Sequence, residues 1–257
     1  MTVPGALLVV EREARIQRRM WRGNAFSLFV GPLLFLGAMG LGLGGLVDER
    51  TGDVEGLTYL AFVTPGLLAV AAMILGSAES LWRTMAGFKW MRYFHAMAAS
   101  PLTPGDVVTG RLLWAALRRA VAAAVFLVVA TALGGVLSPW AVLAVPASVL
   151  VALAFAAPLT AWAATRETDQ PFLVVMRVGI QPLFLFSGTF FPVAQLPDAL
   201  EALALVSPLW HGVELCRAAT TGHGDPAALV VHVAVLVAFA AAGWWWGLRT
   251  FARGLAA

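Results

Sequence analysis

Long charge-free runs alternate along the chain with short stretches that hold nearly all the charged residues. A helix needs about 20 apolar residues to cross the ~30 Å hydrocarbon core of a bilayer. The charge-free run 120–165 is too long for one span, and Gly134-Gly135 with Ser138-Pro139 divides it into two. The pattern therefore predicts a single domain, 1–257, with six spans at about 25–47, 56–80, 107–134, 139–165, 170–191 and 226–248.

Composition supports an all-α integral membrane protein. Of the 257 residues, 60% are apolar and 12% are charged, and the mean hydropathy is +0.84. Soluble domains average about 45–50% apolar and about 25% charged residues. A soluble globule of this composition would expose large apolar patches, and a disordered chain would be far more polar. Cys216 is the only cysteine, which excludes a disulfide framework.

The basic residues predict the orientation of the spans. With both termini in the cytoplasm, 15 of the 17 Lys and Arg residues lie inside, and only Arg50 and Arg217 lie outside. The acidic residues run the other way, so the charge is +9 inside and −6 outside. The basic balance thus reports membrane orientation and gives no indication of nucleic-acid binding. Sixteen arginines against one lysine are typical of a GC-rich bacterial genome, which points to a bacterial plasma (inner) membrane.

Residues 1–24 predict an amphipathic helix at the inner surface. Arg12, Arg15, Arg19 and Arg22 recur on one helical face, and apolar residues occupy much of the other. The segment lacks the apolar core of a cleavable signal peptide. Two interpretations remain open, namely a lipid-surface anchor and a docking face for a cytosolic partner.

The segment between spans two and three is unusually rich in basic and aromatic residues. Pro101 and Pro104 separate a short predicted helix, about 83–99, from the next span, and Asp106 falls where it could cap that span or lie in its first turn. An ordinary cytosolic loop would be shorter and more polar. We therefore favour a partner-contacting helix within 83–104 over a simple loop.

Residues 192–221 predict two short helices that are too short to span and too apolar for a free loop. Asp198 and Glu201 resemble a capping box for the first helix, and Ser207-Pro208 predicts the start of the second. A re-entrant pair in the outer leaflet fits this pattern.

The sequence lacks the usual signatures of a catalytic or metal site. Lys89, the only lysine, does not lie in a phosphate-binding loop, so this chain is not expected to hydrolyse nucleotide. His211 and Glu214 share a helix face, but a metal site needs a further ligand. Ser187-Gly188 lacks the glycine that precedes the serine of membrane serine proteases. We expect no catalytic residue, metal or cofactor; a membrane enzyme acting on lipid-linked substrates and an ion-coupled carrier remain alternatives.

Two charges fall within or beside the predicted spans. Glu79 closes span two, where Arg83 is a candidate partner one turn later, and Arg177 lies about seven residues into span five. Intramembrane charges are functional candidates by default. Both residues are therefore candidates for structural or coupling roles.

Four motifs in order resemble the ABC-2 type permeases, most closely the nodulation-factor (NodJ) and daunorubicin-type drug exporter permeases. They are Tyr59-Leu-Ala-Phe-Val-Thr-Pro-Gly66, Ser100-Pro-Leu-Thr-Pro104, Phe186-Ser-Gly-Thr-Phe-Phe-Pro192 and Ser207-Pro-Leu-Trp-His-Gly-Val-Glu-Leu-Cys-Arg217. The resemblance implies a type V exporter-like fold with an interface helix, a coupling helix and re-entrant helices. It also implies alternating access in a complex of two permease chains and two separate ABC ATPase subunits that bind ATP and Mg.

The resemblance further assigns roles to individual residues. Spans two and five would line the path of an amphipathic drug-like or lipid-linked saccharide cargo. Contact with the ATPase is assigned to Phe88, Lys89, Trp90, Arg92, Tyr93 and His95, together with Arg15 and Arg19. The candidate path-lining residues are Phe62, Met73, Phe184, Phe186 and Phe190.

Overall fold

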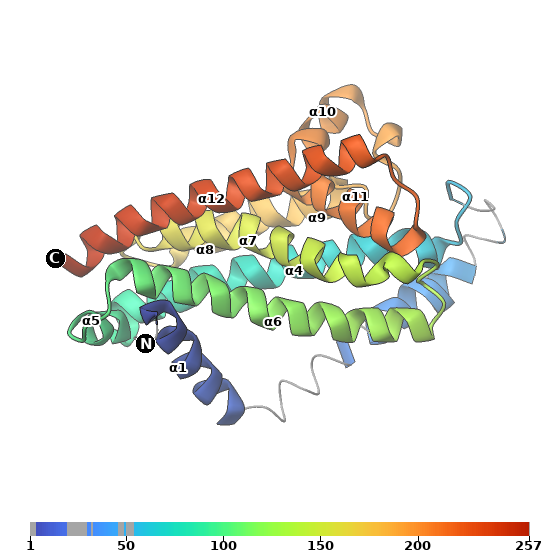
Figure 1. Ribbon diagram of the computed structural model, residues 1–257. Coiled ribbons are helices and arrows are strands. Elements are labelled where there is room, and N and C mark those ends of the chain that lie inside the picture. The colour runs from blue at the N-terminus through green and yellow to red at the C-terminus, as the bar shows by residue number, and fades with distance from the viewer. Residues whose placement is uncertain (1–3, 20–29, 32, 46–48, 50–53, 257) are drawn as a thin grey trace.

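The computed structural model describes residues 4–19, 30–31, 33–45, 49 and 54–256. Within them, four helical segments are long and apolar enough to cross a membrane. They run beside one another along the length of the molecule (Figure 1). They comprise α4 (Tyr59–Met85) with the π-helical turn η2 (Ala86–Trp90), α6 (Pro104–Ala132), the 3₁₀ turn η3 (Pro139–Leu143) with α7 (Ala144–Ala163), and α12 (Pro226–Ala256).

Helix α7 packs against α4, α6 and α12 at the centre of the bundle. Its buried face is rich in alanine, and small residues on its neighbours meet it. A side chain at Gly76 of α4 would meet the Ala152 backbone at 3.2 Å, and one at Gly243 of α12 would clash with Pro158. Because helices in lipid gain stability from close packing, small residues at these contacts hold the long helices together.

The other two predicted spans are less complete in the structure. The predicted span at 25–47 lies partly outside the described residues. Its described part includes the π-helical segment η1 (Gly37–Gly44). Prediction 170–191 corresponds to α8 (Gln170–Val174), η4 (Val175–Ile180) and α9 (Gln181–Phe186). This apolar helix of 17 residues ends before Ser187, five residues earlier than the predicted span. The count of six spans thus stays a prediction.

The segment after span two differs from the predicted helix at 83–99. The helix of span two does not end near residue 80 but continues to Trp90. The chain then reverses at Arg92, whose φ of 53° lies in the left-handed region and stops the helix. Only the six residues of α5 (Tyr93–Ala98) follow before α6. Helix α6 starts at Pro104, three residues before the predicted span at 107, and Asp106 lies in its first turn, where it forms a reciprocal capping box with the N-cap residue Thr103.

The two predicted short helices before span six are confirmed as α10 (Asp198–Val206) and α11 (Pro208–Thr221), which follow the short turn η5 (Val193–Gln195). The Ser207 Oγ accepts from the Leu209 N–H, as the sequence predicted. The capping box at Asp198 was wrong, since Pro197 holds the cap position without a side-chain bond. Helix α11 packs against α4, α7 and α12, whereas α10 projects from the bundle (Figure 1).

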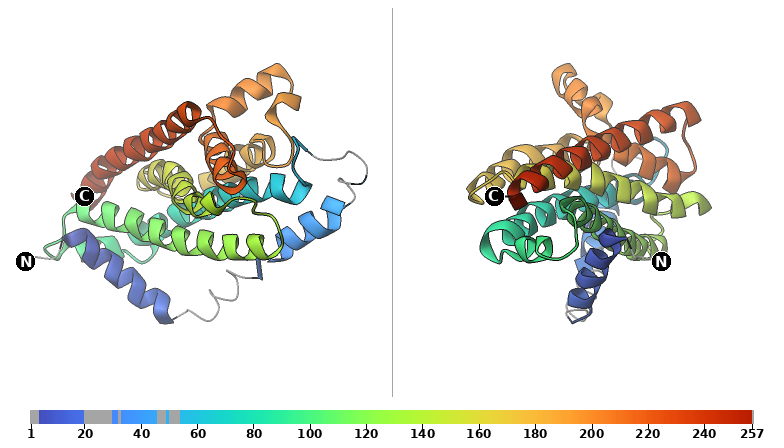
Figure 2. Two further views of the ribbon diagram at one scale, coloured as in Figure 1. Left: turned by 45° about the vertical axis from the view of Figure 1, so that its right-hand side comes forward. Right: turned by 60° about the vertical axis from the view of Figure 1, so that its left-hand side comes forward.

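Helix α1 (Gly5–Arg19) confirms the predicted N-terminal helix as far as Arg19, while Arg22 lies outside the described residues. It leans across the start of α6, where a side chain at Gly110 would meet the Ala6 carbonyl at 2.5 Å. The start of α1, the hairpin that contains α5 and the end of α12 share one end of the molecule, as Figure 1 and the left view of Figure 2 show. We call this end the hairpin end.

Candidate coupling surface, outer pocket and apolar cavity

The hairpin between α4 and α6 presents an exposed tip, defined here as residues 89–92. Trp90 is 56% exposed and Met91 is 75% exposed, although both are apolar. Lys89 and Arg92 flank them and are also exposed, as is His95 on α5. An exposed aromatic beside basic residues is typical of a contact surface.

The tip stands on a buried aromatic cluster. The Phe88 ring lies edge-on to Phe94 at 5.1 Å and to Phe251 of α12 at 4.8 Å between centroids. Phe88 is only 5% exposed, so the structure turns it inward, away from the surface that the sequence assigned to it. Tyr93 is half-buried, and its hydroxyl donates a hydrogen bond to the Arg83 carbonyl at 2.9 Å. Both residues therefore anchor the hairpin to the bundle.

A buried carboxylate joins α1 to this hairpin. The Glu13 side chain is 4% exposed and accepts from Arg12 at 2.9 Å and from Arg83 of α4 at 3.1 Å. The Arg12 guanidinium lies 4.7 Å from the Tyr93 ring centroid. Glu13 was not among the site residues predicted from the sequence. An acid among arginines in an amphipathic helix was the available signal.

The two arginines of α1 assigned to the ATPase contact lie at the surface. Arg15 is exposed and pairs with Glu11 one turn before it, at 2.5 Å. Arg19 is exposed in the last turn of the helix. Both side chains are thus accessible to a partner.

Glu79 pairs with Arg118 of α6 at 2.6 Å. Its expected pairing with Arg83 was wrong, because Arg83 turns to Glu13 of α1. The Glu79–Arg118 pair thus ties two long helices together. Arg177 is exposed on η4, and no ion pair or hydrogen bond to it occurs within the described part of the chain.

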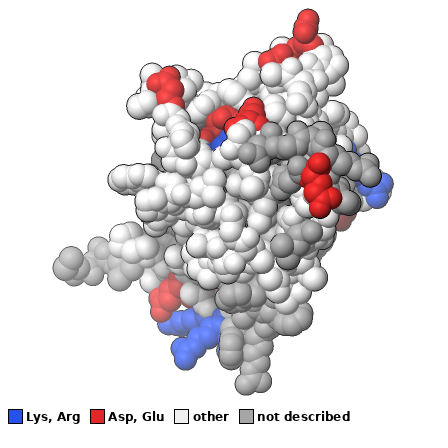
Figure 3. All heavy atoms as spheres, turned by 90° about the vertical axis from the view of Figure 1, so that its right-hand side faces the viewer, with Lys and Arg blue, Asp and Glu red and all other residues white. Residues whose placement is uncertain are grey.

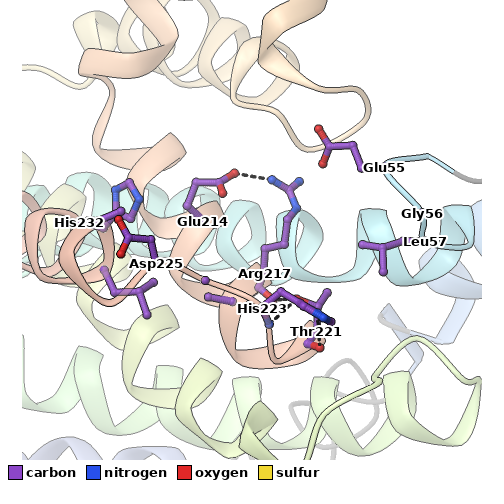
Figure 4. A pocket seen from close by; sticks show the side chains of 13 residues that line it. Glu55, Gly56, Leu57, Glu214, Arg217, Thr221, His223, Asp225 and His232 are labelled. Carbon is purple, nitrogen blue, oxygen red and sulfur yellow. Dashed lines mark hydrogen bonds and ion pairs between the residues drawn. The ribbon is translucent and has the colours of Figure 1, made fainter.

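At the opposite end, a polar pocket of about 380 Å³ lies between α11, the start of α12 and the turn before α4 (Figure 4). Figure 4 shows the Arg217 guanidinium directed at Glu214, with Glu55 on its other side. Arg217 donates to Glu214 and, at 2.7 Å, to the Gly188 carbonyl. It also lies over the Phe62 ring at 4.5 Å. This arginine therefore ties α11 to the loop after α9 and to α4.

The view onto this opposite end is mostly uncharged (Figure 3). Acidic side chains lie on two upper projections and at several other places on this face, and the largest basic cluster lies at the lower edge, the side on which α1 runs in Figure 1.

Two of the four histidines, His211 and His232, lie in contact with each other. The Nδ1 atoms of His211 and His232 lie 2.7 Å apart, and the Trp210 ring lies edge-on to both. Among the described residues, no three His, Cys, Asp or Glu side chains gather as metal ligands would. Ser187 exchanges a hydrogen bond with Thr189 at 3.0 Å.

The five candidate path residues divide into two groups. Phe62 and Met73 are fully buried in the interior of the chain. Phe184, Phe186 and Phe190 are half-buried, and Phe184 packs on Phe190 at 5.1 Å. Phe184 also lines a cavity of about 430 Å³ between α4, α6 and the segment before η1, which we call the apolar cavity.

Four long apolar helices and small-residue packing between them define a helical integral membrane protein. Comparison with known proteins identifies its family. The model of the ABC-2 type transporter family matches residues 6–220, and the chain belongs to that family.

Similar proteins include nodulation proteins and a transport permease. The chain is 31% identical to nodulation protein J of Sinorhizobium fredii over 224 residues, covering 86% of this chain and 84% of that protein. It is 32% identical to nodulation protein J of Rhizobium meliloti with the same coverage. The inner membrane transport permease YadH of Escherichia coli is 25% identical over 92% of this chain and 91% of its own.

Proposed function

We propose that this chain is the membrane-spanning subunit of an ATP-driven exporter in a bacterial inner membrane. Two copies form the pathway, and two copies of a separate ABC ATPase bind at the cytoplasmic hairpin end and supply the ATP and Mg chemistry. The cargo is an amphipathic drug-like or lipid-linked saccharide molecule, moved out by alternating access.

The exposed tip carries this proposal. Trp90, Met91 and Arg92 stand clear of the bundle, while Phe88 beneath them is fixed to Phe251 of α12. A partner that moves the tip therefore pulls on a long helix as well as on a loop. Because α4 continues unbroken into η2, the movement also reaches the candidate path along α4.

Helix α1 belongs to the same unit. Glu13 connects it to Arg83 at the base of the hairpin, and Arg15 and Arg19 face outward beside it. The proposed ATPase contact thus consists of the tip, His95 and the outer face of α1. ATP-driven closure of the ATPase pair shifts the permease between inward- and outward-open packings, because the tip is held differently in the two states.

At the other end, α10, α11 and the outer pocket form the proposed re-entrant gate. Arg217 fastens α11 to Gly188 and stacks over Phe62 of α4. Opening the gate therefore requires these contacts to rearrange together with span two. Glu79 and Arg177 are assigned structural or coupling roles.

The test is co-purification with the ABC ATPase encoded beside the gene, followed by measurement of cargo-stimulated ATP hydrolysis. The variant Trp90→Glu with Arg92→Gly removes the aromatic and basic character of the tip, and glycine accepts the left-handed backbone at residue 92. We expect this variant to lose at least tenfold in ATPase recovery. Asp198→Ala on α10, at the opposite end, is the control and keeps full recovery. Equal recovery of both variants would refute the tip as the contact.

A further inference from the structure

The apolar cavity contains a cation in an otherwise hydrocarbon wall. Leucine, isoleucine, valine and alanine side chains of α4 and α6 line it, together with Phe35, Phe126 and Phe184. Arg119 of α6 and Ser148 of α7 are its only polar lining residues among those the structure describes. A long apolar wall with two convergent polar groups is typical of a site for an amphipathic ligand.

Arg119 is buried far from either end of its helix. It lies 15 residues after Pro104 and 13 residues before Ala132, about 20 Å from each end at 1.5 Å per residue. It is 6% exposed. A charge in this position is costly in a bilayer and is usually retained for a function.

No anion of the described chain neutralises Arg119 directly. The nearby carboxylate, Glu79, attracts it at longer range but bonds to Arg118, which repels Arg119. No hydrogen bond or ion pair to Arg119 occurs within the described residues. Removing a buried cation from water without pairing it costs several kcal/mol, so an anionic partner would be strongly favoured.

Ser148 adds an independent observation. Its side chain is fully buried on the cavity wall, and its Oγ has no hydrogen-bond partner in the described structure. Buried hydroxyls are nearly always bonded, so an orphan on a cavity wall indicates a missing partner. Because the hydroxyl has no accessible surface, a headgroup oxygen would satisfy it once the serine side chain turns toward the cavity.

We propose that the apolar cavity binds a molecule with an acyl or other apolar chain and an anionic headgroup. Arg119 pairs with the phosphate or carboxylate of the headgroup, Ser148 donates to one of its oxygens, and the apolar chain packs against Phe35, Phe126 and Phe184. This inference rests on the proposed function for its role, because it narrows the exported cargo to anionic amphiphiles. The assignment of Arg119, Ser148 and the apolar wall to the parts of the ligand rests on the cavity alone.

The test is binding of two fluorescent lipids to the purified full chain in uncharged detergent. Phosphatidic acid and phosphatidylcholine with the same labelled acyl chain differ only in headgroup charge and size. We expect phosphatidic acid to bind ten- to a hundredfold more tightly. Arg119→Gln should bring the two affinities within twofold, and Ser148→Ala should weaken phosphatidic acid several-fold. Arg249→Gln, which removes an exposed cation of α12, is the matched control and keeps the preference.

Two further arms make each outcome decisive. Phe126→Trp fills the apolar wall and should weaken both lipids equally, while millimolar inorganic phosphate should not displace the probe, since it lacks the apolar chain. Arg119→Gln should unfold at or above the wild-type temperature, because it removes an unpaired buried charge. Equal binding of the two lipids, a preference that survives Arg119→Gln, or displacement by phosphate would overturn the proposal. No ATPase is present, so a failure of the proposed function would not alter these results.

Discussion

The Glu13 bridge offers a sharp test of how α1 is held. The carboxylate is buried and accepts from Arg12 and Arg83, whose side chains are 39% and 34% exposed. A hydrogen bond to a charged group is worth about 1.5–3 kcal/mol, and we count only one because water screens both arginines. Glu13→Gln should therefore weaken the docking of α1 by about 1.5–3 kcal/mol, or roughly 10- to 150-fold in the undocked population.

Hydrogen exchange of the α1 amides in the full-length protein measures this population. An isolated helix of this length is marginal in water, so undocked α1 exchanges readily. Glu11→Gln is the matched control, because the Glu11–Arg15 pair is exposed and worth at most about 1 kcal/mol. We expect protection of α1 to fall 10- to 150-fold in Glu13→Gln and less than about sixfold in Glu11→Gln, with α7 unchanged. Equal losses in the two variants would refute the reasoning.

Three further predictions follow from packing. Phe88→Ala should destabilise the chain by about 3–5 kcal/mol, whereas Trp90→Ala should change stability by less than about 0.5 kcal/mol, as thermal unfolding would report; similar losses would contradict the inward packing of Phe88. Gly110→Val should displace α1 from α6, read as loss of exchange protection in α1 alone, and retained protection would argue against the close approach. Burial raises the pKa of the Cys216 thiol to about 12, so maleimide should label it only after denaturation, and rapid native labelling would contradict the packing of α11.

Much of the helical architecture was predictable because apolar runs and breakers are local signals. Gly134 takes a φ of +82° at the predicted break, and Ser207 caps α11 as expected. The extent of the second span was not predictable, since the sequence predicted a separate short helix at about 83–99, whereas the helix of that span continues to Trp90. Only the left-handed turn at Arg92 ends it, and no residue there signals such a turn.

For the candidate site residues, the sequence predicted exposure correctly only where the neighbouring residues in the chain decide it. The tip residues Trp90 and Arg92 are exposed at the protein surface, as predicted. Phe88, by contrast, packs inward against Phe251, which is 163 residues away in the sequence. Similarly, Glu79 finds Arg118 instead of the nearer Arg83. Tertiary packing sets these partners, and the orphaned Ser148 hydroxyl has no signal in the sequence at all.

Transport in reconstituted vesicles tests the central claim most directly. Proteoliposomes carrying this chain, with or without its ABC ATPase, would be loaded with ATP and Mg or left empty, and movement of a fluorescent anionic amphiphile across the bilayer would be followed. The account predicts movement only when both proteins and ATP are present on the side of the hairpin tip. Equal movement by the chain alone, without ATP, would contradict it.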